Sequence, residues 1–259
     1  MDYENLILAI GDDSVAEITL NRPAQLNTFN TPLATELAQA LNELDSEARV
    51  RVIILKAAGK AFCAGIDVTE FFDKTAMEYR AWTECMERPL IIISRMSKPV
   101  IAQVHGVAAA NGAGLVAAAD LAIAAEDARI GLTAINVGLN CIGPIVPITR
   151  SVGRKRALEL LFYGDFIKAG DALDMGLLNR VVPAADLDKE TRNWAAILAQ
   201  KSPIALQIAK KAFYAAADLD YYKAFAYMNE AFARLCTAED AQEGVKAFLE
   251  KRTPVWKER

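Results

Sequence analysis

The stretch VHGVAAANGAGLVAAADL, residues 104–121, places a run of small residues in front of an apolar, helix-like segment. Asn111, Gly112 and Gly114 stand at the mouth of that segment, with no acidic residue beside them. Small residues let a backbone approach a ligand closely. The first N–H groups of a helix lack intrahelical acceptors and attract negative charge. The stretch therefore predicts a loop-to-helix junction able to hold an anionic oxygen.

A second loop has the same character. KAFCAGID, residues 60–67, follows the apolar strand-like run VRVIILKAA, residues 50–58. Two backbone N–H groups that converge on one point form an oxyanion hole, and removing one such donor typically costs about a hundredfold or more in rate. Composition alone favours close packing of small residues over an oxyanion hole.

The rest of the first 200 residues alternates strand and helix patterns. A hairpin is expected around the turn GDDS, and Thr31 followed by Pro32 is typical of a helix start. Strands are expected at 5–10, 15–23, 50–58, 99–106 and 121–127, and helices at 31–44 and 76–96. This alternation predicts an α/β fold class.

The pattern changes at Ser202–Pro203, from which point the chain reads as helical almost to its end. Helices are expected at 202–218, 221–236 and 237–252, with Ser202 and Thr237 as their starting residues. An apolar stripe runs along the second of them at helical spacing: Tyr221, Phe225, Met228, Phe232 and Leu235. We therefore expect a core of residues 1–201 and a helical region of residues 202–259 that packs on that core, on neighbouring subunits, or on both.

Composition narrows the function classes. The chain has 259 residues, a formal net charge of −4 and scattered basic residues, which argues against a nucleic-acid partner. One histidine and four widely spaced cysteines do not suit a metal site. No apolar run is long enough to span a membrane, and the start is not a secretory signal, so a cytoplasmic location with reduced thiols is expected. The glycines of the opening stretch do not form a dinucleotide-binding fingerprint, and no phosphate-binding loop is present.

Five ordered stretches carry a resemblance over nearly the whole chain. They are ITLNRPAQLNTFN (18–30), VRVIILKAAGKAFCAGIDVTEF (50–71), KPVIAQVHGVAAANGAG with AADLAIAAEDARIG (98–131), VGRKRALELLFYGDFIKAGDALDMGLLNRVV (152–182) and EDAQEGVKAFLEKRTPVW (239–256). Together they resemble the crotonase superfamily, the enoyl-CoA hydratase/isomerase family. The resemblance implies a spiral of ββα units and a C-terminal α-helical oligomerisation region that forms trimers, often paired into hexamers.

The resemblance also implies an acyl-CoA substrate, with coenzyme A as part of the thioester, and no covalently bound cofactor or metal. The oxyanion-hole donors correspond to the backbone N–H groups of Ile66 and Asn111. Asparagine tolerates strained backbone, and a side-chain hydrogen bond from Asn111 to substrate or water is a second hypothesis.

Further positions correspond by resemblance to the coenzyme A site: Ala24, Gln25 and Leu26 along the pantetheine and adenine, Ala64 and Asp67 around the thioester, and Phe248 and Lys251 at the nucleotide end of a neighbouring subunit. For Phe248, simple packing competes with this role. For Lys251, the competing interpretation is a solvated cation near a helix C-terminus.

The chain departs from the family pattern where the chemistry would occur. The two glutamates of a typical hydratase fall on Gly114 and Ala134, and an isomerase-type acid would fall near Cys141 and Ile142. Asn136, Asn140 and Cys141 could orient a water or a substrate oxygen, although a buried structural thiol is the simpler interpretation of Cys141. A carboxylate from the opposite wall could also act, although for each of these acids a solvated helix acid is the simpler interpretation: Asp67, Glu70, Glu84 or Glu87.

The sequence thus predicts an enzyme that acts on an acyl-CoA thioester through an oxyanion-stabilised enolate. Because both usual glutamates are absent, hydration of an unusual enoyl-CoA, alicyclic or dienoyl, is the leading hypothesis. Gly114 and Ala134 would widen the pocket, which fits a bulkier acyl group. Double-bond isomerisation, thioester hydrolysis and non-catalytic acyl-CoA binding remain as alternatives.

Overall fold

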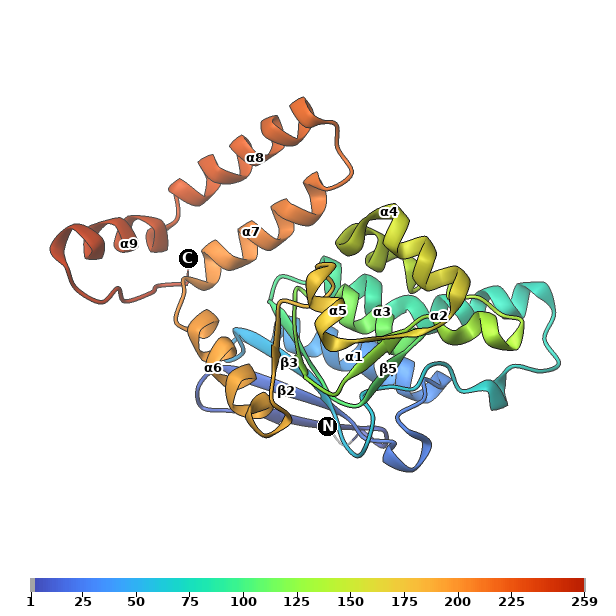
Figure 1. The fold of residues 1–259 in the computed structure, drawn as a ribbon. Helices are drawn as coiled ribbons and strands as arrows, with labels where there is room; N and C mark the ends of the chain where they lie inside the picture. The colour runs from blue at the N-terminus through green and yellow to red at the C-terminus, as the bar shows by residue number, and fades with distance from the viewer. Residues whose placement is uncertain (1–2, 259) are drawn as a thin grey trace.

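The computed structural model describes residues 3–258, and two sheets organise it (Figure 1). The larger sheet has six strands in the order β1-β2-β3-β4-β6-β9. Its strands are β1 (Leu6–Ile10), β2 (Val15–Leu20), β3 (Val52–Ala57), β4 (Val100–Val104), β6 (Leu121–Ala125) and β9 (Arg180–Val182). β1 and β2 form the expected antiparallel hairpin, and every other pair is parallel.

A smaller sheet of three short strands contains the beginning of the 104–121 stretch. Its members are β5 (Val107–Ala109), β7 (Arg129–Gly131) and β8 (Phe166–Lys168). β5 pairs with β7 in parallel, and β7 pairs with β8 in antiparallel fashion. β5 begins two residues after β4 has ended in the larger sheet, so the chain turns from one sheet into the other just before the stretch that opens α3.

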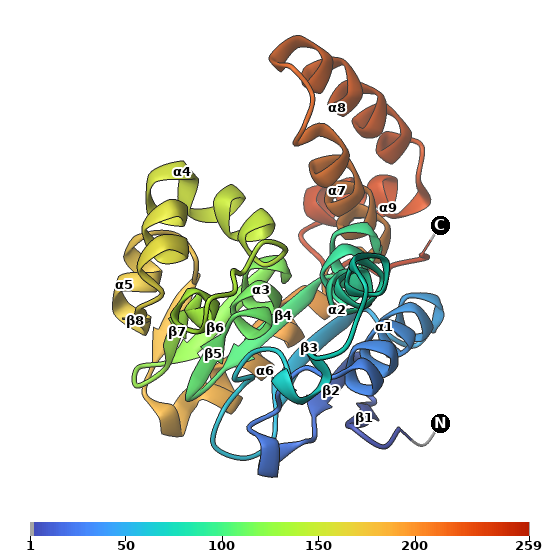
Figure 2. The same cartoon turned by 90° about the vertical axis from the view of Figure 1, so that its right-hand side faces the viewer.

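Helices cover both faces of the large sheet (Figure 2). One face packs against α1 (Thr31–Ser46), α2 (Ala76–Arg95) and α3 (Asn111–Ala118) in the main core. The other face packs against α6 (Leu187–Ala199) through a smaller cluster. The remaining elements of this region are α4 (Ile145–Tyr163), α5 (Ala169–Asp174) and the short 3-10 turns η1 (Pro23–Gln25), η2 (Val68–Glu70), η3 (Thr133–Val137) and η4 (Ala184–Asp186). The α/β fold class expected from the sequence is confirmed.

Two of the expected helix starts are wrong by one residue. The N-cap of α1 is Asn30, whose side chain accepts a hydrogen bond from the Leu33 amide, and Thr31 already belongs to the helix. The N-cap of the last helix is Ala238, because the Thr237 hydroxyl donates back to the Arg234 carbonyl of the preceding helix. Ser202 does cap its helix, as expected.

The C-terminal region leaves the core as a protruding group of helices (Figure 1). It consists of α7 (Pro203–Ala216), α8 (Tyr221–Cys236) and α9 (Glu239–Glu250). No residue of α8 is buried, and its apolar stripe is open: Tyr221, Phe225 and Phe232 are 71%, 56% and 66% exposed. Packing of this stripe on the chain's own core, one of the two expected options, is therefore wrong for the part of the chain described.

A buried ion pair fixes α7 to the core. The Lys210 ammonium lies 2.6 Å from a carboxylate oxygen of Asp120, at the start of β6, and also donates to the Lys98 carbonyl at 2.8 Å. The Val100 amide and the Tyr214 hydroxyl donate to the same carboxylate at 2.7 and 3.0 Å. Every polar atom of the pair is thereby engaged, which is the condition under which a buried charge pair is tolerated.

Breaking this pair should destabilise the fold strongly. In Asp120→Ala the Lys210 charge stays buried without its partner, so we expect a loss of about 3 kcal/mol or more in the free energy of unfolding. The control is Asp218→Ala, which removes an exposed pair with Arg150 and should cost under about 1 kcal/mol. Urea denaturation of the two variants checks the difference, and equal losses would contradict it.

Candidate active site

The 60–67 loop lies directly against the turn that leads into α3. The Phe62 amide donates to the His105 carbonyl at 3.0 Å, and the Cys63 amide donates to the Val107 carbonyl at 3.0 Å. The Ala109 amide returns a hydrogen bond to the Cys63 carbonyl at 2.8 Å. The two loops that the sequence analysis singled out are thus joined by backbone hydrogen bonds, although they lie some 45 residues apart along the chain.

Glycine makes this approach possible. A Cβ atom added at Gly112 would lie 2.3 Å from the Cys63 carbonyl oxygen, and one added at Gly65 would lie 3.3 Å from the Ala110 Cβ. Gly65 also has a φ of +108°, which side chains rarely allow. Larger residues at these positions would force the two loops apart.

Within the described residues, backbone amides are left without a hydrogen-bond acceptor on both loops, among them those of Ile66 and Asn111. On either side of Ile66 the backbone is engaged, because the Gly65 carbonyl accepts from Phe29 and the Asp67 amide donates to the Phe29 carbonyl. Within residues 3–258, no hydrogen bond is donated by the amides of Ile66 or Asn111. Asn111 is the first residue of α3, so its N–H also lies at the positive end of the helix dipole. Both donors expected for an oxyanion hole are therefore available.

Asn111 itself differs from the expectation in two respects. The strained residue is its neighbour Ala110, with φ +48° and ψ −110°, whereas Asn111 is helical. Its side chain is buried and directs its amide nitrogen to the Met86 carbonyl of α2, at 3.4 Å. The Asn111 side chain therefore links α3 to α2.

The acids near the 60–67 loop are mostly committed to structural contacts. Asp67 forms an ion pair with Arg22 at 3.0 Å, and Glu70 accepts hydrogen bonds from the amide and hydroxyl of Thr31 and from the indole N–H of Trp82. Glu84 is exposed on α2 and pairs with Arg80 one turn earlier. The fourth acid, Glu87, is half-buried and has neither an ion pair nor a hydrogen bond in the described chain.

The positions expected around the pantetheine form an exposed turn beside the same loop. Ala24, Gln25 and Leu26 are exposed, and the Leu26 carbonyl accepts a hydrogen bond from the Ala64 amide at 3.0 Å. Sequence reasoning missed the residue that holds this turn, Asn27. Its fully buried side chain accepts from the Arg22 amide and donates to two carbonyls of the 58–61 segment, each at 2.8 Å.

Phe248 and Lys251 lie on the protruding region, at the end of α9, which is well removed from α3 in both views (Figures 1 and 2). Phe248 is 81% exposed, so the packing interpretation does not hold within this chain. Lys251 adopts a left-handed conformation, with φ +55°, as the C-cap of the helix. Any contact of these residues with a thioester site would have to be made across a subunit boundary.

The polar residues expected on the pocket wall are dispersed. Asn136 donates to the Gly164 carbonyl at the end of α4, at 3.0 Å, and Asn140 is exposed. Cys141 is buried, and its burial raises the pKa of the thiol although the Ala134 backbone N–H acts in the opposite direction. A thiol with a raised pKa stays protonated at neutral pH, which disfavours a nucleophilic role.

The space at the first missing glutamate is already filled. A Cβ at Gly114 would lie 2.9 Å from Leu90 Cδ2 and 3.0 Å from Pro144 Cβ. The expectation that Gly114 widens the pocket is therefore wrong, since neighbouring side chains occupy the volume that a glutamate would take.

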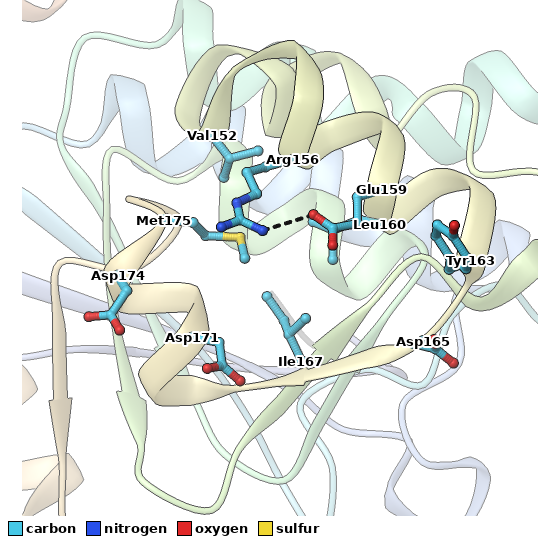
Figure 3. A pocket seen from close by; sticks show the side chains of 10 residues that line it. All are labelled: Val152, Arg156, Glu159, Leu160, Tyr163, Asp165, Ile167, Asp171, Asp174 and Met175. Carbon is cyan, nitrogen blue, oxygen red and sulfur yellow. Dashed lines mark hydrogen bonds and ion pairs between the residues drawn. The ribbon is translucent and has the colours of Figure 1, made fainter.

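One cavity lies elsewhere and does not suit a nucleotide. It has a volume of about 650 Å³ and lies between α4, β8 and α5 (Figure 3). Its charged lining consists of one arginine, Arg156, which pairs with Glu159, and three aspartates: Asp165, Asp171 and Asp174. This excess of negative charge would repel the phosphates of coenzyme A. Neither the 60–67 loop nor the start of α3 lines it.

Residues 3–258 offer neither a metal-binding cluster nor a membrane-spanning helix. These residues contain no group of three or more histidine, cysteine, aspartate and glutamate side chains placed to hold a metal ion. In the same part of the chain, every helix is too short or too polar to cross a membrane.

The Arg22–Asp67 pair should give a pH-dependent contribution to stability. Burial acts to raise the pKa of Asp67, but hydrogen bonds from Thr69 and Arg22 prevail and lower it below its ordinary value of 3.8. Stability from this group is therefore complete above pH 4 and is lost as the pH falls through the lowered native pKa. Asp67→Asn should lower the free energy of unfolding by about 1–2 kcal/mol at pH 7. The difference between the variant and the native protein should narrow as the pH falls. Chemical denaturation between pH 7 and pH 2 checks this, and a gap that does not narrow would contradict it.

Comparisons with known proteins identify the family of this chain. A family model described as enoyl-CoA hydratase/isomerase matches residues 11–259. The human mitochondrial protein named enoyl-CoA hydratase domain-containing protein 3 is 36% identical over 246 residues, which are 94% of this chain and 81% of the human protein. A probable enoyl-CoA hydratase of Mycobacterium tuberculosis is 36% identical over 98% of each chain.

The fold is shared as well. The crystal structure of an enoyl-CoA hydratase from Mycobacterium smegmatis superposes with a TM-score of 0.95 at 39% identity, covering 97% of this chain and 98% of that one. This confirms the expected crotonase-like fold. With a family model that spans nearly the whole sequence and relatives above 30% identity along nearly all of it, the chain belongs to the enoyl-CoA hydratase/isomerase family.

Proposed function

We propose that the protein binds an acyl-CoA thioester with its carbonyl oxygen between the amides of Ile66 and Asn111, and converts it through an enolate. The observation that carries this proposal is the pair of free amides on two loops held together by glycine. Negative charge develops on the thioester oxygen as the enolate forms, and donors already in position stabilise that charge without reorganising.

Hydration of an enoyl-CoA is the reaction we favour. It is supported by the names of the relatives, which are described as enoyl-CoA hydratases, including a probable one from Mycobacterium tuberculosis. The filled space at Gly114 removes one argument for a bulky acyl group. Alicyclic and dienoyl thioesters are therefore no better supported as substrates than straight-chain ones. Double-bond isomerisation and thioester hydrolysis use the same oxyanion hole and are the alternatives.

The test uses mass spectrometry in heavy-oxygen water. The protein is incubated with straight-chain, branched and cyclic enoyl-CoA esters, and we expect one thioester to gain a molecule of labelled water. Labelled free acid with released coenzyme A would instead support the hydrolase. No change in mass and no shift of the double bond would contradict an enzymatic function and leave an acyl-CoA-binding protein.

A pair of glycine variants ties the turnover to the oxyanion hole. Gly112→Ala places a methyl group against the Cys63 carbonyl, so it should separate the two loops and lower turnover about a hundredfold. Gly170→Ala, in α5, meets no atom within 4 Å and should leave turnover unchanged.

We further propose that the protein is a homotrimer or a dimer of trimers, assembled through α7, α8 and α9. The support is the set of large apolar side chains that these helices expose, among them Phe213, Phe225 and Phe232 at 63%, 56% and 66% exposure. Such an assembly would also bring Phe248 and Lys251 toward a neighbouring thioester site.

Light scattering on the eluting protein tests the assembly. We expect a mass three or six times that of the 28.2 kDa chain. The double variant Phe225→Glu, Phe232→Glu places charges on the exposed face of α8 and should yield smaller species. The control Ile7→Glu changes an exposed apolar residue of β1 and should leave the mass unchanged. A native protein that elutes as a monomer would contradict the proposal.

A further inference from the structure

Glu87 lies on α2, the helix that packs against α3. The residue before it, Met86, accepts the side-chain hydrogen bond of Asn111. One turn later, Leu90 reaches the space beside Gly114. These two contacts place α2 along the first turn of α3, and Glu87 falls between them. The Glu87 carboxylate therefore comes from a different helix than position 114, where a typical hydratase carries its first glutamate.

A glycine makes room for this carboxylate. A Cβ atom built on Gly143 would lie 1.8 Å from Glu87 Oε1 and 2.3 Å from its Cδ, so any side chain at position 143 would expel the carboxylate from its place. Pro144, the next residue, is the one that packs over Gly114. Pro144 thus packs against position 114, where a typical hydratase has a glutamate, and Gly143 leaves room for the carboxylate of Glu87 from α2.

The Glu87 carboxylate has no structural contact that would explain its half-buried position. Asp67, Glu70 and Glu84 all have ion pairs or hydrogen bonds, whereas Glu87 has neither within residues 3–258. Burial, with the like charge of Glu84 adding to it, raises the pKa of Glu87 above the ordinary glutamate value. A raised pKa lies closer to neutral pH. A group whose pKa is near the working pH accepts and donates a proton most efficiently.

We propose that Glu87 is the proton-transfer group of this enzyme, replacing from α2 the acids absent at Gly114 and Ala134. This inference rests on the proposed acyl-CoA function and assigns a residue to it. The solvated helix acid, the simpler interpretation of Glu87, does not account for a carboxylate seated over the backbone of Gly143.

The hydration step balances with this one carboxylate. The Glu87 carboxylate removes a proton from water as the water oxygen bonds to the β-carbon of the enoyl thioester. The electron pair of the carbon–carbon double bond moves to form the enolate, whose oxygen is held by the amides of Ile66 and Asn111. The carboxylic acid then gives the proton to the α-carbon, which restores the thioester and the carboxylate. The net change is addition of one water.

The experiment compares four variants in two measurements. Turnover is measured for whichever of crotonyl-CoA, 3-methylcrotonyl-CoA and cyclohex-1-ene-1-carbonyl-CoA the native protein converts fastest. Binding is measured by calorimetry with butyryl-CoA, which has no double bond to hydrate. Glu87→Gln keeps the size of the side chain and removes the exchangeable acid. Gly143→Ala keeps Glu87 but displaces its carboxylate. Glu159→Gln and Gly170→Ala are the matched controls, since Glu159 is an exposed acid on α4 and Gly170 lies in open space.

We expect Glu87→Gln and Gly143→Ala each to lower kcat by about a hundredfold or more, with the Kd for butyryl-CoA within about threefold of the native value. Both controls should keep turnover and binding. Glu87→Gln turning over within threefold of the native protein would overturn the assignment, as would a parallel loss of binding and turnover. A native protein that binds butyryl-CoA but converts none of the esters would overturn it too. A native protein that does not bind butyryl-CoA at all would refute the proposed function itself.

Discussion

The close approach of the 60–67 loop to the start of α3 is the constraint on which the site depends. Backbone hydrogen bonds between Cys63 and β5 set the distance between the two segments, and Gly65 and Gly112 allow it. The amides of Ile66 and Asn111 stay free because the backbone groups beside them are already engaged. Positioned donors of this kind stabilise a developing oxyanion without reorganisation, so most of the catalytic design lies in main-chain geometry.

The side chains around this arrangement serve mainly to hold it. Asn27 fixes the turn before the loop, Arg22 and Asp67 form an ion pair across its base, and the Asn111 side chain ties α3 to α2. Ala110 carries a positive φ that costs energy and persists because its neighbours fix the backbone. With Gly114 packed by Leu90 and Pro144, the proton chemistry is left to Glu87 on α2.

Much of this fold follows from the sequence. The long helices α1, α2 and α7 and the first hairpin repeat their apolar residues at a clear period, and the two small-residue loops of the sequence are joined by backbone hydrogen bonds in the fold. The strands β5, β7 and β8 have only three residues each, too few to show a period. The strain at Ala110, the filled space at Gly114 and the seat of Glu87 over Gly143 all arise from contacts between segments distant in sequence, so no local pattern could predict them. The apolar stripe of α8 could be read from its helical spacing, but spacing alone does not say what packs on it.

The most direct test of the central claim is the infrared spectrum of crotonyl-CoA labelled with carbon-13 at the thioester carbonyl. Two hydrogen bonds from Ile66 and Asn111 should polarise that carbonyl, so we predict that its stretching frequency falls on binding to the native protein. The fall should be smaller in Gly112→Ala, in which the two loops are pushed apart. A bound thioester whose carbonyl frequency equals the value in water would contradict the account, because the free amides would then have no part in holding the substrate.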